Sequence, residues 1–234
     1  MRQLRASPYP GVYLTYNCLS AGASPVYAPL IMNNYYGWDT SVNVQNTSAD
    51  RASISIEHLN PDGSLARSRS DSLPPYTSSS YYSPSEDLPD GFIGTARITS
   101  NQSVAVVVNQ SYPHGGSPVR GMSCNGTSSG STYVVLPDML NYYGDENWVS
   151  SVNVQNLSTI SSSDVTLTYQ GQSVNAAINP KGFVSFYVPS CWGTTPSRGP
   201  ATVSASQPVA VVVNHASVDQ TGVDLTRSYN GCNR

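Results

Sequence analysis

Charged residues are scarce in this chain of 234 residues, because Asp, Glu, Lys and Arg together supply 11% of it. An ordinary globular domain carries about 25%. Lys181 is the only lysine, and the arginines are scattered without forming a run. Nucleic-acid binding requires clustered positive charge. This composition, with a formal net charge of -3, therefore predicts no nucleic-acid partner.

Long apolar runs are also absent. No stretch approaches the roughly 18 apolar residues of a membrane-spanning helix, so the sequence predicts no membrane span. Residues 1–5 (MRQLR) lack the apolar core of a secretory signal. The features described below nevertheless predict export. A leader removed earlier or a misassigned initiator Met would reconcile this start with export, whereas a cytosolic protein would not.

The residue patterns of catalytic and metal sites are missing as well. The three histidines belong to no Ser-His-Asp or Cys-His motif. The four cysteines have neither Cys-x-x-Cys spacing nor a nearby histidine, which argues against zinc. The carboxylates at residues 86–90 and 145–146 are too few for a calcium loop. We therefore expect no enzyme activity, no cofactor and no metal ion.

The strongest positive signal is an internal repeat, in which three blocks recur in the same order with offsets of 110, 107 and 105 positions. The blocks are SVNVQN at 41–46 and 151–156, NYYG at 34–37 and 141–144, and VAVVVN at 104–109 and 209–214. Such a pattern indicates a duplicated domain with loop insertions. We expect one insertion, of three residues, around residues 145–148.

Each copy has the rhythm of short β-strands. Val42 and Val44 alternate with polar residues, which places one face in a core and the other in solvent. Turns are expected at the two Asn-Pro-x-Gly segments, 60–63 and 179–182, because Pro fixes one dihedral and Gly accepts a positive φ. Helical periodicity is absent. The sequence therefore predicts an all-β chain of two tandem antiparallel β-sandwich domains.

The two valine-rich runs, 104–108 and 209–213, are apolar at nearly every position, so they do not read as half-exposed strands. Something must cover the second face of each. One explanation is a central strand beneath a long loop. The other is contact with a neighbouring subunit, because exposed apolar patches commonly mark interfaces.

A third copy of one strand stands at the beginning of the chain. Segments 117–126 and 222–231 close the two domains, and residues 11–17 resemble them. An extra strand satisfies its backbone groups by adding to a sheet edge, either of its own first domain or of another copy. We predict donation to another copy, head to tail, which builds a filament. The candidate donor strand consists of Val12, Tyr13, Leu14, Thr15 and Tyr16.

A family resemblance rests on residues 35–46 (YYGWDTSVNVQN), residues 94–109 (GTARITSNQSVAVVVN) and their echoes. They resemble the tandem β-sandwich (Ig-like) repeats of large bacterial surface proteins. The resemblance covers nearly the whole chain and implies extracellular display and structural work. Strand donation is similar in architecture to the assembly of pilus subunits.

The cysteines are candidates for disulfide bonds in an exported protein. Four thiols allow three pairings, and the sequence does not choose among them. Cys191 and Cys232 lie in the same copy, which favours their pairing, with Cys18 and Cys124 paired or free. A bond from Cys18 to Cys191 or Cys232 of another chain is a further alternative.

Several Asn-x-Ser/Thr sequons make covalent glycans a candidate modification. A surface with little charge needs another means of staying soluble. The candidate sites are Asn46, Asn101, Asn109, Asn125 and Asn156.

Aromatic residues cluster at equivalent places in the two copies. They are Tyr35, Tyr36 and Trp38 in the first and Tyr142, Tyr143 and Trp148 in the second. Such a group either stacks against sugars or packs at the end of a sandwich with its hydroxyls in water. Their presence in both copies favours the structural role.

The sequence thus predicts an N-terminal extension (1–22) and two β-sandwich repeats (23–126 and 127–234). We expect an extracellular structural subunit whose partner is another copy of itself. The alternative function is an adhesin or carbohydrate-binding surface module.

Overall fold

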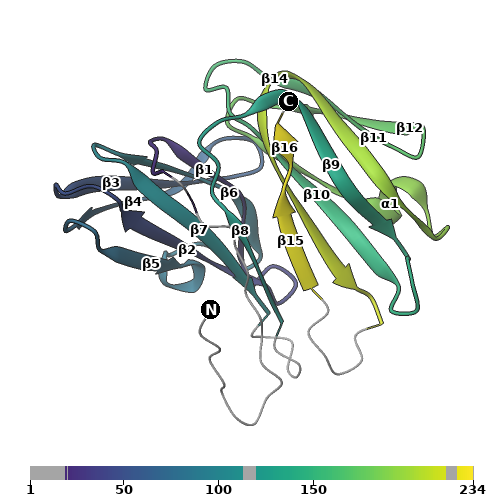
Figure 1. Ribbon diagram of the computed structural model, residues 1–234, viewed down its shortest axis with the longest axis horizontal. Coiled ribbons are helices and arrows are strands. Elements are labelled where there is room, and N and C mark those ends of the chain that lie inside the picture. Colours follow the sequence, from purple (N-terminus) through teal and green to yellow (C-terminus); the bar gives the residue numbers. More distant parts are fainter. Residues whose placement is uncertain (1–18, 20, 113–119, 220–225, 234) are drawn as a thin grey trace, which may run out of the picture.

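The computed structural model describes residues 19, 21–112, 120–219 and 226–233, and it is almost entirely β-structure (Figure 1). The predicted all-β fold is therefore confirmed. The candidate donor strand (12–16), Cys18 and His114 lie outside the described residues. Among the described residues, no helix is long and apolar enough to cross a membrane.

The first repeat, residues 23–127, is built from two four-stranded antiparallel sheets. One sheet has the order β1-β6-β3-β4 and the other the order β5-β2-β7-β8. The strands are β1 (Val26–Asn33), β2 (Asp39–Asn46), β3 (Ala52–Leu59), β4 (Leu65–Leu73), β5 (Ser78–Tyr82), β6 (Phe92–Ser100), β7 (Val104–Ser111) and β8 (Gly121–Asn125), with the 3-10 turn η1 (Ser83–Ser85) after β5.

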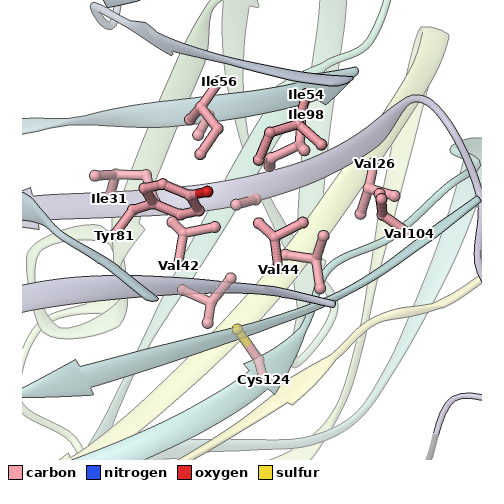
Figure 2. Packing of buried hydrophobic residues seen from close by; sticks show 14 of the residues in the cluster. Val26, Ile31, Val42, Val44, Ile54, Ile56, Tyr81, Ile98, Val104 and Cys124 are labelled. Carbon is pink, nitrogen blue, oxygen red and sulfur yellow. The ribbon is translucent and has the colours of Figure 1, made fainter. Parts of the chain in front are cut away.

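The core of the first repeat lies between these sheets. Val42 and Val44 project inward from β2 and meet Ile54 and Ile56 of β3, as the alternating pattern predicts. Figure 2 shows these side chains pointing toward one another, with Cys124 of β8 at the margin of the cluster.

The second repeat, residues 131–233, has the same strands in one continuous eight-stranded sheet. They are β9 (Ser131–Asn141), β10 (Trp148–Asn156), β11 (Ser163–Tyr169), β12 (Gln172–Ile178), β13 (Phe183–Tyr187), β14 (Ser197–Ser217), β15 (Thr226–Asn230) and β16 (Cys232–Asn233), with the helix α1 (Val188–Trp192) after β13.

Strand β14 explains the single sheet, because its 21 residues correspond to both β6 and β7. Its first part pairs with β9 and β11, and its second part pairs with β10 and β15. The register against β9 shifts between Ser204 and Val209, near the place where the first repeat has a turn. The predicted closing strands are β8 and β15, which pair with β7 and β14.

The duplication is visible in matched contacts, and these correct one sequence alignment. The amide nitrogens of Asn33 and Asn141 each donate to two backbone carbonyls at the same place in their repeats. Tyr35 forms an isolated β-bridge with Trp38, and Tyr143 forms one with Trp148. Tyr143 therefore corresponds to Tyr35, one position away from the match suggested by the NYYG blocks. The loop insertion is consequently two residues, not three.

The two predicted turns use different residues for the left-handed position. Gly63 adopts φ +86° in the first turn. In the second turn Lys181 has φ +61°, and Gly182 does not take the positive value. The prediction that Gly supplies the positive φ is therefore right at 60–63 and wrong at 179–182.

Candidate functional site

The two repeats meet along the side of the first sandwich where β1 and β8 are edge strands. Val212, which points outward from β14, is completely buried and belongs to the hydrophobic cluster of the first repeat. Cys124 is the small inward residue of β8 in the same cluster. The second repeat therefore completes the core of the first.

Strands β8 and β15 lie side by side at this junction (Figure 1). Polar side chains of β15 donate hydrogen bonds to alternate backbone carbonyls of β8. These are Thr226 Oγ1 to Gly121 O (3.0 Å), Ser228 Oγ to Ser123 O (2.7 Å) and Asn230 Nδ2 to Asn125 O (2.8 Å). Side chains thus satisfy part of the edge of β8 and protect it from further pairing.

Neutral amides form another part of the polar junction. Asn214 Nδ2 donates to Gln110 Oε1 (2.7 Å), and Gln155 Nε2 donates to Thr95 Oγ1 (3.0 Å). All four side chains are buried. Because these groups are neutral, their hydrogen bonds give specificity without the desolvation cost of an ion pair.

The surface that the second repeat uses here is copied on the first. We call it the duplicated face: eight outward residues of β2, β5 and β7 that recur unchanged at the equivalent positions of β10, β13 and β14. The equivalent pairs, aligned by strand register, are Ser41/Ser151, Asn43/Asn153, Gln45/Gln155, Ser80/Ser185, Tyr82/Tyr187, Ala105/Ala210, Val107/Val212 and Asn109/Asn214. Three further outward pairs at the ends of these strands differ: Asp39/Val149, Ser78/Phe183 and Ser111/Ala216.

Burial of this face differs between the repeats. In the second repeat, Asn153, Gln155, Ala210 and Val212 are buried by the first repeat. In the first repeat, Gln45 is exposed and Val107 is half-buried. The predicted cover of the second valine run is therefore a neighbouring repeat of the same chain and not a loop.

A cavity of about 610 Å³ lies at the junction and is lined by both repeats. None of the described residues that line it carries a charge. Its lining residues include Leu30, Met32, Tyr35, Tyr36, Trp38, Ile93 and Met122 of the first repeat and Val149, Ser151, Asn153, Ser185, Tyr187 and Asn214 of the second.

The predicted aromatic residues do not form one surface. Tyr35, Tyr36 and Trp38 line this cavity. Their equivalents in the second repeat do not line the cavity and lie beneath arginines instead. The Arg198 guanidinium lies 5.4 Å from the Tyr143 ring centroid, and that of Arg227 lies 5.0 Å from the Trp148 ring centroid. Tyr142 is half-buried. Burial, and to a smaller extent the nearby Tyr142 phenol, raises the pKa of Tyr187.

The three cysteines within the described residues are free, so the predicted Cys191–Cys232 disulfide is not formed. Cys191 is on α1, whose following residue Gly193 accepts a hydrogen bond from Asn141 at the end of β9. Cys232 pairs with Val135, which lies on β9 six residues before Asn141. Six residues along a strand span roughly 20 Å. The two cysteines are therefore at opposite ends of this stretch of β9, whereas bridged cysteines need Cα atoms within about 7 Å.

Cys124 is not a reactive thiol. It is 4% exposed, and burial raises its pKa to about 12. Because the thiolate is the reactive form, this cysteine acts as a small core residue.

Two of the predicted glycosylation sites are wrong for this fold. Asn46 and Asn156 are completely buried, and each amide nitrogen donates to three backbone carbonyls that end the neighbouring turns. A glycan on that nitrogen has no room. Asn109 and Asn125 are half-buried at the junction side of the first repeat, and Asn101 is exposed in the turn after β6.

His215 is buried beside Ser150 at the junction of β10 and β14. His215 Nδ1 lies 2.8 Å from Ser150 Oγ, which accepts the backbone N–H of Leu140. Burial first, then the charge of Arg227, lowers the pKa of His215 to about 4. In the first repeat Thr40 and Gln110 occupy the equivalent positions. Since that pair has the same structural place without a histidine, we assign the Ser150–His215 contact to packing.

Metal-site geometry is likewise not found: within the part of the chain that the structure describes, no group of three His, Cys, Asp or Glu side chains could hold an ion.

Comparisons with known proteins give no family. No family model matches the chain, and no curated protein matches it. One solved structure, "Crystal Structure of Thermotoga maritima 1070", is similar with a TM-score of 0.40 and 21% sequence identity, covering 45% of this chain and 94% of that one.

Proposed function

We propose that the protein is a non-enzymatic structural subunit of an extracellular filament or surface layer, in which β-sandwich repeats dock on one another. The observation that carries this proposal is the duplicated face. The centre of one copy (Asn153, Gln155, Ala210, Val212 and Asn214) is buried against a sandwich of this kind, whereas the other copy has the same eight side chains and remains accessible.

Identical outward residues are concentrated on this face, which is why it supports docking. Outward positions of the opposite sheet differ between the repeats. They include Ser53/Asp164, Ser55/Thr166, Glu57/Thr168 and Arg97/Thr202. Solvent-facing positions of a strand have no packing constraint that holds them the same. A surface that packs against protein does have one.

We propose that a second copy of the chain covers the free duplicated face. Ala105 and Val107 supply an apolar centre, and Asn43 and Gln45 supply hydrogen-bonding groups around it. Because none of the eight side chains of this face carries a charge, the association should depend little on salt. Strand donation by residues 12–16 remains a second proposed contact between copies.

Self-association of the full chain tests this proposal. We expect sedimentation velocity to show oligomers that grow with protein concentration, and negative-stain microscopy to show extended assemblies. Val107→Asp should leave the chain monomeric, because docking would bury an unpaired carboxylate.

The matched control is Ser53→Asp, which adds the same charge on an exposed position of β3 in the opposite sheet. This variant should associate like the unmodified chain. A protein that stays monomeric at every concentration, or a Val107→Asp variant that associates normally, would contradict the proposal.

A further inference from the structure

We propose that the cavity between the repeats is a binding site for a neutral saccharide. This inference is independent of assembly, because the cavity lies within one chain. Its volume, about 610 Å³, falls in the range of about 300–1,000 Å³ that small-molecule sites occupy.

The second repeat provides an internal comparison for this site. Strand register places Arg198 at the position of Ile93, and Arg227 at the position of Met122. Ile93 and Met122 line the cavity. In the second repeat, the two arginines lie over the equivalent aromatic rings and form ion pairs with Asp138. The first repeat thus has short uncharged side chains where the second covers its rings with arginine.

The chemistry of the lining selects the ligand class. Tyr35, Trp38 and Tyr187 offer aromatic faces, on which the C–H face of a pyranose ring packs. Ser151, Ser185 and Asn153 offer hydroxyl and amide groups for sugar hydroxyls. A charged ligand would lose hydration without meeting an opposite charge among the described lining residues, so we infer a neutral sugar.

The rim of the cavity is open to solvent. Tyr36 is 82% exposed and Tyr187 is 43% exposed. Tyr36 also has φ +49°, a backbone conformation that is uncommon for a bulky residue. The equivalent Gly144 of the second repeat has φ +75°, so this conformation belongs to the turn that both repeats share. In the first repeat the turn carries Tyr36 at the rim of the cavity.

The test is a titration of ¹⁵N-labelled full chain with three neutral probes: cellotriose, mannotriose and the N-acetylglucosamine trisaccharide. We expect at least one probe to shift the indole N–H resonance of Trp38 while that of Trp192 stays in place. Ile93→Arg reproduces the arrangement of the second repeat and should weaken binding at least tenfold. Ile160→Arg adds the same charge at a position that is 87% exposed and should bind normally.

Tyr187→Ala removes a ring from the rim of the cavity and should also weaken binding. Because Tyr187 is partly exposed, this second variant tests the site even if Ile93→Arg disturbs the packing of the junction. The proposal is overturned by saturable binding that Ile93→Arg and Tyr187→Ala both leave unchanged. It is overturned equally if none of the three saccharides binds, or if toluene binds the cavity and the saccharides do not.

Discussion

His215 is a buried neutral imidazole at a position where the first repeat has Gln110. His58 of β3 is also buried, and desolvation lowers its pKa to about 4. In the unfolded chain both imidazoles have an ordinary pKa near 6.5. As the pH falls below 6.5, the unfolded state therefore binds protons that the folded state does not.

The protein should accordingly lose stability between pH 6.5 and pH 4. Each histidine contributes roughly 3 kcal/mol of this loss, since one pKa unit corresponds to about 1.4 kcal/mol. His215→Gln copies the solution of the first repeat. It should make the fall in unfolding free energy between pH 7 and pH 4.5 smaller by roughly 2–3 kcal/mol, as measured by urea denaturation. An unchanged pH dependence would contradict this assignment.

Buried asparagines show where residue-level prediction failed. Asn46 and Asn156 match the glycosylation pattern, but each one ends a strand and caps turn carbonyls from inside the fold. Both asparagines end the same hexapeptide, SVNVQN, and this recurrence was the sequence signal that could have indicated a structural role. A sequon describes local sequence, whereas burial depends on chain segments more than twenty positions away.

At the scale of elements, the closing strands β8 and β15 decide how each sandwich is completed. Tyr229 of β15 occupies the position of Cys124. Its ring lies 5.5 Å from His215, and its hydroxyl donates to the backbone carbonyl of Asp138 on β9. The second repeat thus closes the β15 edge of its core with an aromatic ring of its own. The first repeat has a small thiol there and takes Val212 from its neighbour.

We expect Tyr229→Cys to destabilise the second repeat by about 2–3 kcal/mol, because it leaves a cavity where a ring packs. Tyr229→Phe removes only the hydroxyl and should cost about 1 kcal/mol. Free energies from chemical denaturation measure both effects. If the two variants lose the same unfolding free energy, the Tyr229 ring does not contribute to the packing of the second core.

At the scale of the whole molecule, the two repeats are unequal partners. The hydrophobic cluster of the first repeat includes a residue of the second, whereas the second cluster is formed by its own residues, among the described part of the chain. The first repeat therefore depends on docking more than the second does.

Val212→Asp tests this dependence, because it places a carboxylate in the core of the first repeat. Amide hydrogen exchange should become at least tenfold faster in β1 and β8, although the substituted residue belongs to the other repeat. Strands β11 and β12, on the far side of the second repeat, should keep their protection (Figure 1). Ile160→Asp, on an exposed position, should change neither region. Uniform loss of protection throughout would contradict the proposed asymmetry.

Fold class, duplication and the inward residues of the strands follow from the amino-acid sequence alone. Alternation of apolar and polar residues and recurrence of blocks are local or linear properties, so Val42, Val44 and both closing strands could be identified from the chain. The sequence also predicts cover on the second face of each valine run, and the structure confirms it for the second run.

The tertiary structure was needed to show what covers the second run, that Cys191 and Cys232 are not bridged, and where the aromatic residues lie. Equivalent residues acquire different surroundings in the two repeats, because the repeats pack on each other asymmetrically. Val107 and Val212 are identical in sequence context, yet one is half-buried and the other completes a core. No local pattern distinguishes them, since the difference lies in the neighbour.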